Sequence, residues 1–554
     1  MRRTVIIGPP PTPNGDLHVG HVAGPYLAAD VYARWLRATG RPVLYASGTD
    51  DSQTYVVASA AKLGTTPGEL AERSWHAIEA TLRAMGVTVD GFAPFDEHYR
   101  AMVLDFADRL YRAGRFELRT VRLPWSVRNE QFLVEGLVSG GCPVCLAVSR
   151  GGLCETCGHP NNCAELIDPR STIDPDDDVV TRPASILVLP LERYRGQLTA
   201  YYESRQSAWR PHIVQLMREL LARPLPDFPI TYPTPWGIPA PFQETPGQVF
   251  NAWFEGMPAS MYCTEVAQRE HGENPSGTDE EWLAGSGIRL VYFLGFDNAY
   301  FWGVTHLAAL MAHDGRYALP DVIVSNEFYE LENEKFSTSK GHVVWARDLV
   351  SEVPRDLVRF YLALTAPEYA RTNFSRAALD TITASRLVQP WNVLAGALNK
   401  AVAELGVQGR ELPVSADAAR RRATMTERFA ACYELESFSL TRAADLVALH
   451  VARLADAANT VDFTAADFRN ADTGGTGGTG GTGGTGAAAR EQALGDLYAE
   501  TAGLVLAASP VLVDLADAAA TAGAVLDATA GADAATTVRP FTVPLLDSDH
   551  ERRR

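Results

Sequence analysis

The chain has 554 residues, which predicts roughly three or four domains. Apolar residues make up 46% and charged residues 21%, a globular balance that excludes a disordered or collagen-like chain. The 49 basic and 67 acidic side chains give a net charge of −18. That charge argues weakly against binding a polyanion over the whole surface, because phosphate binding needs clustered lysine and arginine.

The start of the sequence has no signal-peptide pattern, and no stretch of about 18 apolar residues lacks a charge. Seven cysteines in a chain of this length do not make a disulfide scaffold. We therefore expect a cytoplasmic protein with no membrane partner.

The predicted elements begin as strand, turn and helix. Thr4–Gly8 is a β-branched run, a proline-rich turn follows, and a helix is expected to start near His18. Arg41–Ala46 predicts a second buried strand, and loops that carry function at strand ends are typical of the doubly wound α/β fold. Further strands are expected at Val249–Trp253, Arg289–Gly295 and Asp321–Val324.

Two later segments differ in composition from the α/β stretches. A cysteine-rich segment, Cys142–Cys163, interrupts them. From about Arg376 the sequence is rich in alanine and leucine with helical periodicity, which predicts a helical bundle. The repeated Thr-Gly-Gly of residues 473–486 predicts a flexible loop between two helices of that bundle.

The strongest local motif is the run PPPTPNGDLHVGH that ends at His21. His18 and His21 are three residues apart and share one face of a helix, at the first turn, where free backbone N–H groups favour anions. Gly20 between them leaves room for a flat ring. The pattern suits a nucleoside triphosphate; the alternative is a helix start with two surface histidines.

A second motif, EKFSTSKG, spans residues 334–341. Small hydroxyl residues lie between two lysines, and such a loop can close over a pyrophosphate and donate charge in the transition state. The alternative is an exposed charged turn.

Together, HVGH and KFSTSK resemble HIGH and KMSKS, the two signatures of class I aminoacyl-tRNA synthetases. The methionyl type is most similar: PTPNG at residues 11–15 resembles its PYANG, and GTDD at 48–51 resembles its GTDEHG. ELIDP at 165–169 and DLVRFY at 356–361 are further similarities. The resemblance implies a Rossmann-like α/β class I catalytic domain with a zinc-bearing insertion, followed by an α-helical bundle.

The implied domains are a first catalytic half at 1–115, a connective insertion at 116–235 and a second catalytic half at 236–345. A junction at 346–375 and an anticodon-domain-like bundle at 376–545 follow.

The resemblance also implies the reaction and the residues that carry it. The enzyme would be an AMP-forming ligase that activates an amino acid with ATP and Mg²⁺ as an aminoacyl-adenylate. The implied catalytic residues are His18, His21, Lys335 and Lys340. ATP would be bound by Thr12, Gly20, Asp297, Ser337 and Ser339, and the amino acid by Asp50, Trp253, Ser260, Trp302 and His306.

The loop departs from the family pattern at one position. The second lysine of KMSKS is Thr338 here, so we expect Lys335 or the nearby Lys340 to take over its role. Loss of one transition-state donor costs about 3–4 kcal/mol.

Four cysteines form two Cys-x-x-Cys pairs, the usual set for structural zinc. They are Cys142, Cys145, Cys154 and Cys157. The family's insertion carries a similar knuckle, and His159 and Cys163 lie nearby as spare ligands.

The amino-acid pocket departs from the methionyl pattern. The family's tyrosine of PYANG is Thr12, its later tyrosine is Ser260, and its pocket histidine and tryptophan are Trp302 and His306. The arginine that partners the ammonium-binding aspartate aligns with Tyr232. We expect a changed, smaller side chain as substrate; the alternative is a drifted pocket that still takes methionine.

The bundle lacks the family's anticodon-reading residues. The first bundle helix reads WNVLAGALN at 391–399 with no arginine, and no Pro-Trp follows 457–463. We therefore expect tRNA binding to be doubtful, since stacking contributes about 1–3 kcal/mol per base.

Three hypotheses follow. The first is a tRNA-independent ligase of the specialised-metabolism, hydrazine-forming group, which transfers the acyl group to a small nucleophile such as an N-hydroxylated amine; GTDDSQ at 48–53 resembles that group. A separate cupin would then be a partner enzyme. The second is a methionyl-tRNA synthetase, and the third a weakly catalytic regulatory relative.

Overall fold

The computed structural model describes residues 2–205, 209–277, 279–336, 341–461, 483–526 and 536–547. The chain forms two compact units. The first, here called the sheet unit, comprises Met1–Ala33, Arg41–Tyr329 and Pro367–Arg371; the second, the helical unit, comprises Arg34–Gly40, Glu330–Ala366 and Thr372–Arg554.

A parallel sheet of four strands is the centre of the sheet unit. Its order is β15-β14-β1-β2, and the pairs bring Ile6 opposite both Tyr45 and Val291. β1 and β2 are buried along their whole lengths, as is typical of a parallel sheet covered on both faces. The strands are β1 (Thr4–Ile7), β2 (Val43–Ala46), β14 (Arg289–Gly295) and β15 (Val322–Asn326).

The strand order places a switch point beside β1, because the chain continues to β2 on one side and later returns to β14 on the other. In such sheets ligands bind at the carboxyl ends of the strands. The histidine motif follows β1, the GTDD loop follows β2, and Asp297 follows β14. The α/β fold predicted from the sequence is confirmed.

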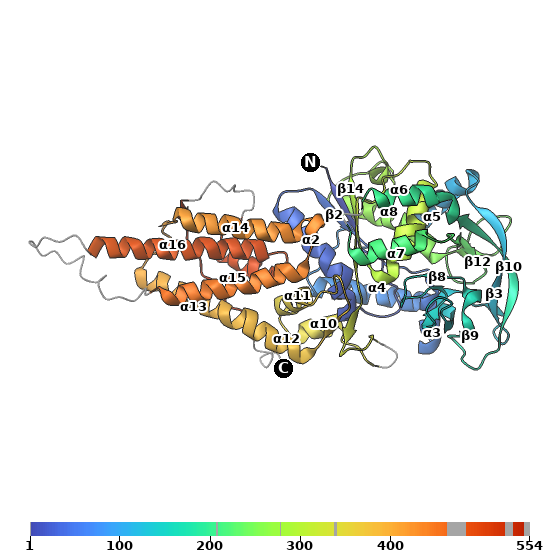
Figure 1. Ribbon diagram of the computed structural model, residues 1–554, viewed down its shortest axis with the longest axis horizontal. Helices are drawn as coiled ribbons and strands as arrows, with labels where there is room; N and C mark the ends of the chain where they lie inside the picture. Colours follow the sequence, from blue (N-terminus) through green and yellow to red (C-terminus); the bar gives the residue numbers. More distant parts are fainter. Residues whose placement is uncertain are drawn as a thin grey trace, which may run out of the picture. The chain divides into compact units, whose positions relative to one another are not determined.

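Helices surround this sheet and connect its strands (Figure 1). After β1 the chain forms α1 (Val19–His21), a wider turn η1 (Val22–Tyr26) and α2 (Leu27–Ala38). The others are α3 (Thr54–Leu63), α4 (Pro67–Ala84), α5 (Glu97–Arg112), α6 (Arg195–Glu203), α7 (Pro211–Leu221), α8 (Ala252–Glu270) and α9 (His306–Met311), with η7 (Phe296–Asn298) and η8 (Phe301–Thr305) before α9.

The strand expected at Val249–Trp253 is only partly present. β13 (Val249–Phe250) pairs with β12 (Thr231–Tyr232), and α8 begins directly afterwards at Ala252. Asn251 ends the strand because its side-chain oxygen accepts a hydrogen bond from Trp253 N at 3.0 Å and so caps the helix. The apolar run is therefore a short strand followed by the first turn of a buried helix.

The insertion is antiparallel. Its larger sheet has the order β11-β10-β3-β4, formed by β3 (Glu117–Ser126), β4 (Gln131–Phe132), β10 (Val179–Pro190) and β11 (Asp227–Pro229). The cysteine-rich part is built from a small sheet, β5 (Val138–Gly141), β6 (Val148–Arg150) and β9 (Ile167–Ser171), and a hairpin, β7 (Gly152–Leu153) with β8 (Pro160–Asn161).

In the helical unit, α13, α14, α15 and α16 run side by side (Figure 1). Buried charges join α11 to the start of α17 and the residues before it: Asp356 accepts from the backbone N–H groups of Asp514 and Leu515, and Arg359 donates to the carbonyls of Pro510 and Val511. The helices are α10 (Ala346–Glu352), α11 (Arg355–Leu364), α12 (Arg376–Thr383), η10 (Ala384–Val388), α13 (Gln389–Leu405), α14 (Ala416–Tyr433), α15 (Leu440–Thr460), α16 (Gly483–Ala508) and α17 (Val513–Thr521).

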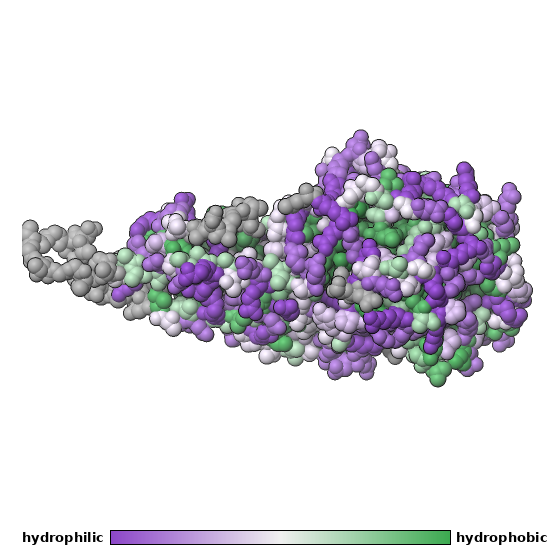
Figure 2. Space-filling view, turned by 45° about the horizontal axis from the view of Figure 1, so that its top comes forward, coloured by the Kyte–Doolittle hydropathy of each residue, from purple (hydrophilic) through white to green (hydrophobic). Residues whose placement is uncertain are grey.

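Residues 473–482 of the Thr-Gly-Gly segment lie outside the described residues, and its last residues, from Gly483, begin α16. Among the helices described, none is both long and apolar enough to span a membrane. On the face drawn in Figure 2, hydrophilic residues cover most of the surface and hydrophobic residues show as small patches.

Candidate functional site

The histidine motif lies at the carboxyl end of β1. His18 caps α1: its Nδ1 accepts a hydrogen bond from Gly20 N at 3.1 Å, and the His21 Nδ1 accepts from His18 N at 3.3 Å. The rings stack, with centroids 3.7 Å apart. Because each Nδ1 is an acceptor, each neutral ring carries its proton on Nε2 and presents an N–H donor away from the backbone.

The proline-rich turn is tied to its neighbours by backbone carbonyls. Tyr26 donates its hydroxyl to Pro9 O at 2.8 Å, and Asp50 N donates to Pro11 O at 3.1 Å. The second contact holds the turn that carries Thr12 against the GTDD loop after β2. Two loops predicted to bind substrate are thus brought together.

Asp50 is nearly buried, and its carboxyl group has one side-chain hydrogen-bond partner among the residues that the structure describes. Its Oδ2 accepts from Gln53 Nε2 at 2.6 Å, and Gln53 is fully buried. Burial raises the pKa of Asp50 well above its usual range, and the Gln53 hydrogen bond opposes that shift. Gln53 was not predicted from the sequence, although it follows Asp50 by three residues, the spacing that lets it reach back.

Other carboxyl groups surround Asp50. Glu255 of α8 accepts from Ser52 Oγ at 2.8 Å and from the Tyr99 hydroxyl at 3.0 Å, and burial raises its pKa to about 8. Burial also raises the pKa of Glu135 to about 8, with Asp50 adding repulsion. Asp51 accepts from Thr49 Oγ1 at 2.6 Å.

None of these four carboxyl groups forms an ion pair with another residue that the structure describes. A buried acidic cluster without a cation favours binding a positively charged group.

The predicted side-chain pocket combines α8 with η8 and α9. Trp253 stacks on Phe301, with centroids 3.8 Å apart. His306 Nε2 lies 2.6 Å from Trp253 O and therefore donates to it, and burial lowers the pKa of His306 to about 4, so the ring is neutral. Trp302 is buried edge-on against His306.

Two positions of α8, Gly256 and Ser260, border the pocket side chains. A Cβ on Gly256 would lie 2.8 Å from His306 Cε1, so only glycine leaves room for the ring. The Ser260 hydroxyl donates to Gly256 O at 2.8 Å, so its proton is used in a hydrogen bond to the backbone of the same helix. The His306 Nδ1 is buried with no hydrogen-bond partner among the described residues.

Asp297 follows β14 and accepts from Asn298 Nδ2 at 3.0 Å. A Cβ on Gly295 would lie 2.5 Å from Asp297 Oδ1, so glycine lets the carboxylate fold over the end of the strand. Of the second motif, Lys335 is described and exposed, whereas Ser337, Thr338, Ser339 and Lys340 lie outside the described residues.

The four predicted metal ligands converge. The Sγ atoms of Cys142, Cys145, Cys154 and Cys157 all lie within 4.8 Å of one another, including pairs at 3.6 and 3.9 Å. Four thiolates around zinc, at about 2.3 Å each, are about 3.8 Å apart, so the cluster fits the ion.

The two spare ligands are used elsewhere. Cys163 belongs to an apolar core cluster, and the His159 Nδ1 lies 3.0 Å from Cys157 O.

Paired histidines after β1, with acidic loops at the neighbouring strand ends, are the arrangement expected of a class I aminoacyl-tRNA synthetase. The family model described as "tRNA synthetases class I (M)" matches residues 4–396. The chain therefore belongs to this family, in its methionyl type.

Individual relatives support the same family assignment. A methionine–tRNA ligase from Porphyromonas gingivalis is 31% identical over 379 residues, 68% of this chain and 54% of the relative. One from Roseiflexus sp. is 32% identical over 395 residues, 70% of this chain and 66% of the relative. The chain thus spans about half the length of the first of these.

For the fold alone, a Mycobacterium tuberculosis methionyl-tRNA synthetase solved with methionyl-adenylate superposes with a TM-score of 0.74 at 19% identity, over 99% of both chains.

These findings correct one expectation. The missing arginine in α13 and the missing Pro-Trp after residues 457–463 led us to doubt tRNA binding, but the relatives are named methionine–tRNA ligases, so that expectation is wrong. A few residues in short segments of the bundle were too local a criterion for judging tRNA binding. The resemblance to the specialised-metabolism group, with its small acyl acceptor and cupin partner, has no support from these relatives.

Proposed function

We propose that the protein is an ATP-dependent aminoacyl-tRNA ligase of the methionyl type. The observation that carries the proposal is the stacked pair His18 and His21, which presents two Nε2–H donors at the carboxyl end of β1. Membership of the family and the names of the relatives support a tRNA acceptor and methionine as the first amino acid to test.

In the first step a substrate carboxylate oxygen would attack the α-phosphorus of ATP, and the bond to the departing pyrophosphate would break. His18 and His21 would donate to the phosphate oxygens as charge moves onto the leaving group. Bound Mg²⁺ would neutralise part of the phosphate charge. Gly20 would leave space for adenine, and Asp297 would accept from the ribose hydroxyls.

The amino acid would be held by its ammonium on Asp50. A charge-assisted hydrogen bond of this kind is available to any α-amino acid, so side-chain selection falls to the pocket formed with Trp253, Trp302 and His306. In the second step a tRNA hydroxyl would attack the acyl carbon and release AMP.

Zinc would be held by the four cysteines of the insertion. Four thiolates leave no position for water or substrate, so the ion would stabilise the knuckle and take no part in the reaction.

Two assays test the proposal. Pyrophosphate exchange with each amino acid identifies the substrate activated, and charging of total tRNA identifies the acceptor. We expect methionine-dependent exchange and methionylated tRNA. Exchange with transfer to an N-hydroxylated amine and not to tRNA would contradict the acceptor, and absence of exchange with every amino acid would contradict the ligase.

A further inference from the structure

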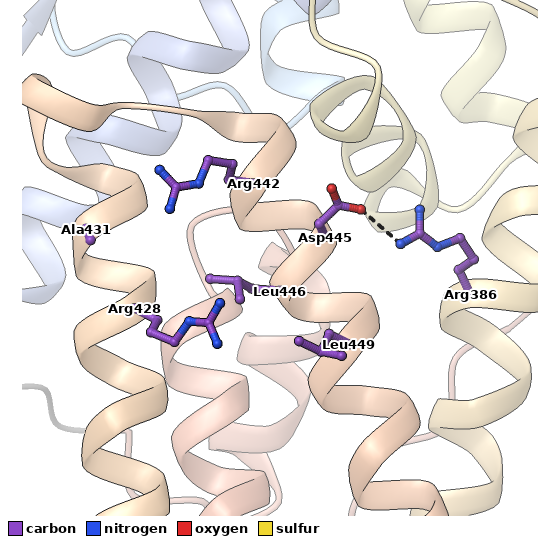
Figure 3. Close-up of a pocket in the computed structure, with 7 residues that line it drawn as sticks. All are labelled: Arg386, Arg428, Ala431, Arg442, Asp445, Leu446 and Leu449. Carbon is purple, nitrogen blue, oxygen red and sulfur yellow. Dashed lines mark hydrogen bonds and ion pairs between the residues drawn. The ribbon is translucent and has the colours of Figure 1, made fainter.

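The helical unit has a hollow of about 410 Å³ between α14, α15 and η10 (Figure 3). Three arginines reach it from three different helices, together with one carboxylate and two leucines. The lining residues are Arg386, Arg428, Ala431, Arg442, Asp445, Leu446 and Leu449.

The charges of this hollow are only partly neutralised. Arg386 pairs with Asp445 at 2.9 Å, on the side of α15 that faces η10. Arg428 of α14 and Arg442 of α15 extend over the gap between their two helices (Figure 3). Neither guanidinium has a hydrogen bond or ion pair with a described residue.

Neighbouring arginines of the same unit behave differently. Arg420 pairs with Asp417, and Arg421 and Arg453 both pair with the buried Glu500. In a protein with a net charge of −18, Arg428 and Arg442 place two positive charges beside one hollow. Their charge is complementary to an anion.

The floor of the hollow is apolar. Leu446 is nearly buried, whereas Leu449 is 53% exposed. A ribose-phosphate chain matches this combination, because its phosphates carry the charge and its sugars present apolar edges. Arginine also forms bidentate hydrogen bonds to phosphate.

The helix that carries the family's anticodon contacts is engaged elsewhere. Asn392 of α13 uses its amide for two hydrogen bonds to the backbone of Leu546, at 2.8 and 2.9 Å, and Asn399 bonds the backbone of Val543 in the same way. The arginine-lined hollow belongs to other helices and makes no use of these positions.

We propose that the hollow between α14, α15 and η10 binds the phosphodiester backbone of RNA through Arg428 and Arg442. The proposal rests on the proposed function, because the RNA in question is the tRNA acceptor. It adds a phosphate-binding surface away from α13.

The test compares the double variant R428A/R442A with the matched double variant R410A/R420A. The control removes the same charge from two exposed arginines that are ion-paired, with Glu491 and Asp417. Binding of tRNA is measured by fluorescence anisotropy at several salt concentrations, and pyrophosphate exchange is measured in parallel to check the fold and the catalytic site.

For R428A/R442A we expect tRNA binding to weaken roughly tenfold and the slope of log K against log salt to fall by roughly 1.4 to 1.8, since each phosphate contact contributes about 0.7 to 0.9. Exchange should be unchanged, and the control should keep the full slope. If the two double variants show equal slopes of log K against log salt and tRNA is charged normally, the proposed RNA-binding surface is wrong and the proposed function stands.

Two further outcomes are distinguishable. If polyglutamate binds the wild type more tightly than R428A/R442A while tRNA binds both equally, the occupant is an acidic protein segment and the proposal is wrong. If the wild type neither binds nor charges tRNA, the surface proposal and the proposed function both fail.

Discussion

Gln53→Leu removes the one side chain that hydrogen-bonds the Asp50 carboxyl within the described part of the chain. A hydrogen bond to a charged group contributes about 1.5–3 kcal/mol, and this one is short and fully buried. If Asp50 binds the substrate ammonium, we expect KM for the amino acid to rise by about 10- to 150-fold in pyrophosphate exchange. KM for ATP should change little.

The pH dependence gives a second readout. Burial already raises the pKa of Asp50, and Gln53 counteracts that shift. Without Gln53 the pKa rises further, so the ionised fraction falls at any given pH. The acidic limb of kcat/KM for the amino acid should therefore move to higher pH.

A matched control is Gln248→Leu, which also removes a buried amide, one that donates to Ser185 O at 2.7 Å. It should lower stability without moving the pH profile. An unchanged KM and pH profile in Gln53→Leu, or an equal shift in the control, would refute the role of Gln53 as a positioning residue.

Three other changes have defined outcomes. Glu255→Gln should raise the thermal midpoint of unfolding at pH 8.5 but not at pH 4.5. The pKa of Glu255 is about 8 in the folded protein and lower in the unfolded chain, so the wild type loses stability as the pH rises from the unfolded to the folded pKa. Equal gains at both pH values would contradict this. Cys145→Ser should lower the zinc content measured by mass spectrometry and lower the thermal midpoint; unchanged zinc would exclude Cys145 as a ligand. Gly256→Ala should displace His306 and raise KM for the amino acid in exchange assays, and an unchanged KM would show that the ring is free to move.

The sequence located the parts of the site that depend on local spacing. The histidines meet at one helix start because they are three positions apart, and four cysteines converge because two short knuckles pair. The strand at Arg289–Gly295 agrees with its prediction because a continuous apolar run suits a parallel sheet buried on both faces.

Features that depend on distant segments could not be predicted in the same way. Glu255 meets Ser52 across 203 residues, and Asn392 meets the backbone of Leu546 across 154 residues. Neither contact leaves a pattern in either segment. The tRNA prediction failed for a related reason, since it judged the whole recognition surface from two short segments of the sequence.

Helix α8 connects the two halves of the predicted amino-acid site. Gly256 faces His306, whereas its neighbour Glu255 faces Ser52 and Tyr99, beside the loop that carries Asp50. Burial keeps Glu255 protonated near neutral pH, which limits the repulsion that a further charge would exert on Asp50. Gln53 opposes the effect of burial on Asp50, because its hydrogen bond stabilises the charged form of that carboxyl group. A substrate ammonium bound beside Asp50 would stabilise its ionised form further, whereas any substitution that ionises Glu255 at lower pH should raise the pKa of Asp50 by repulsion.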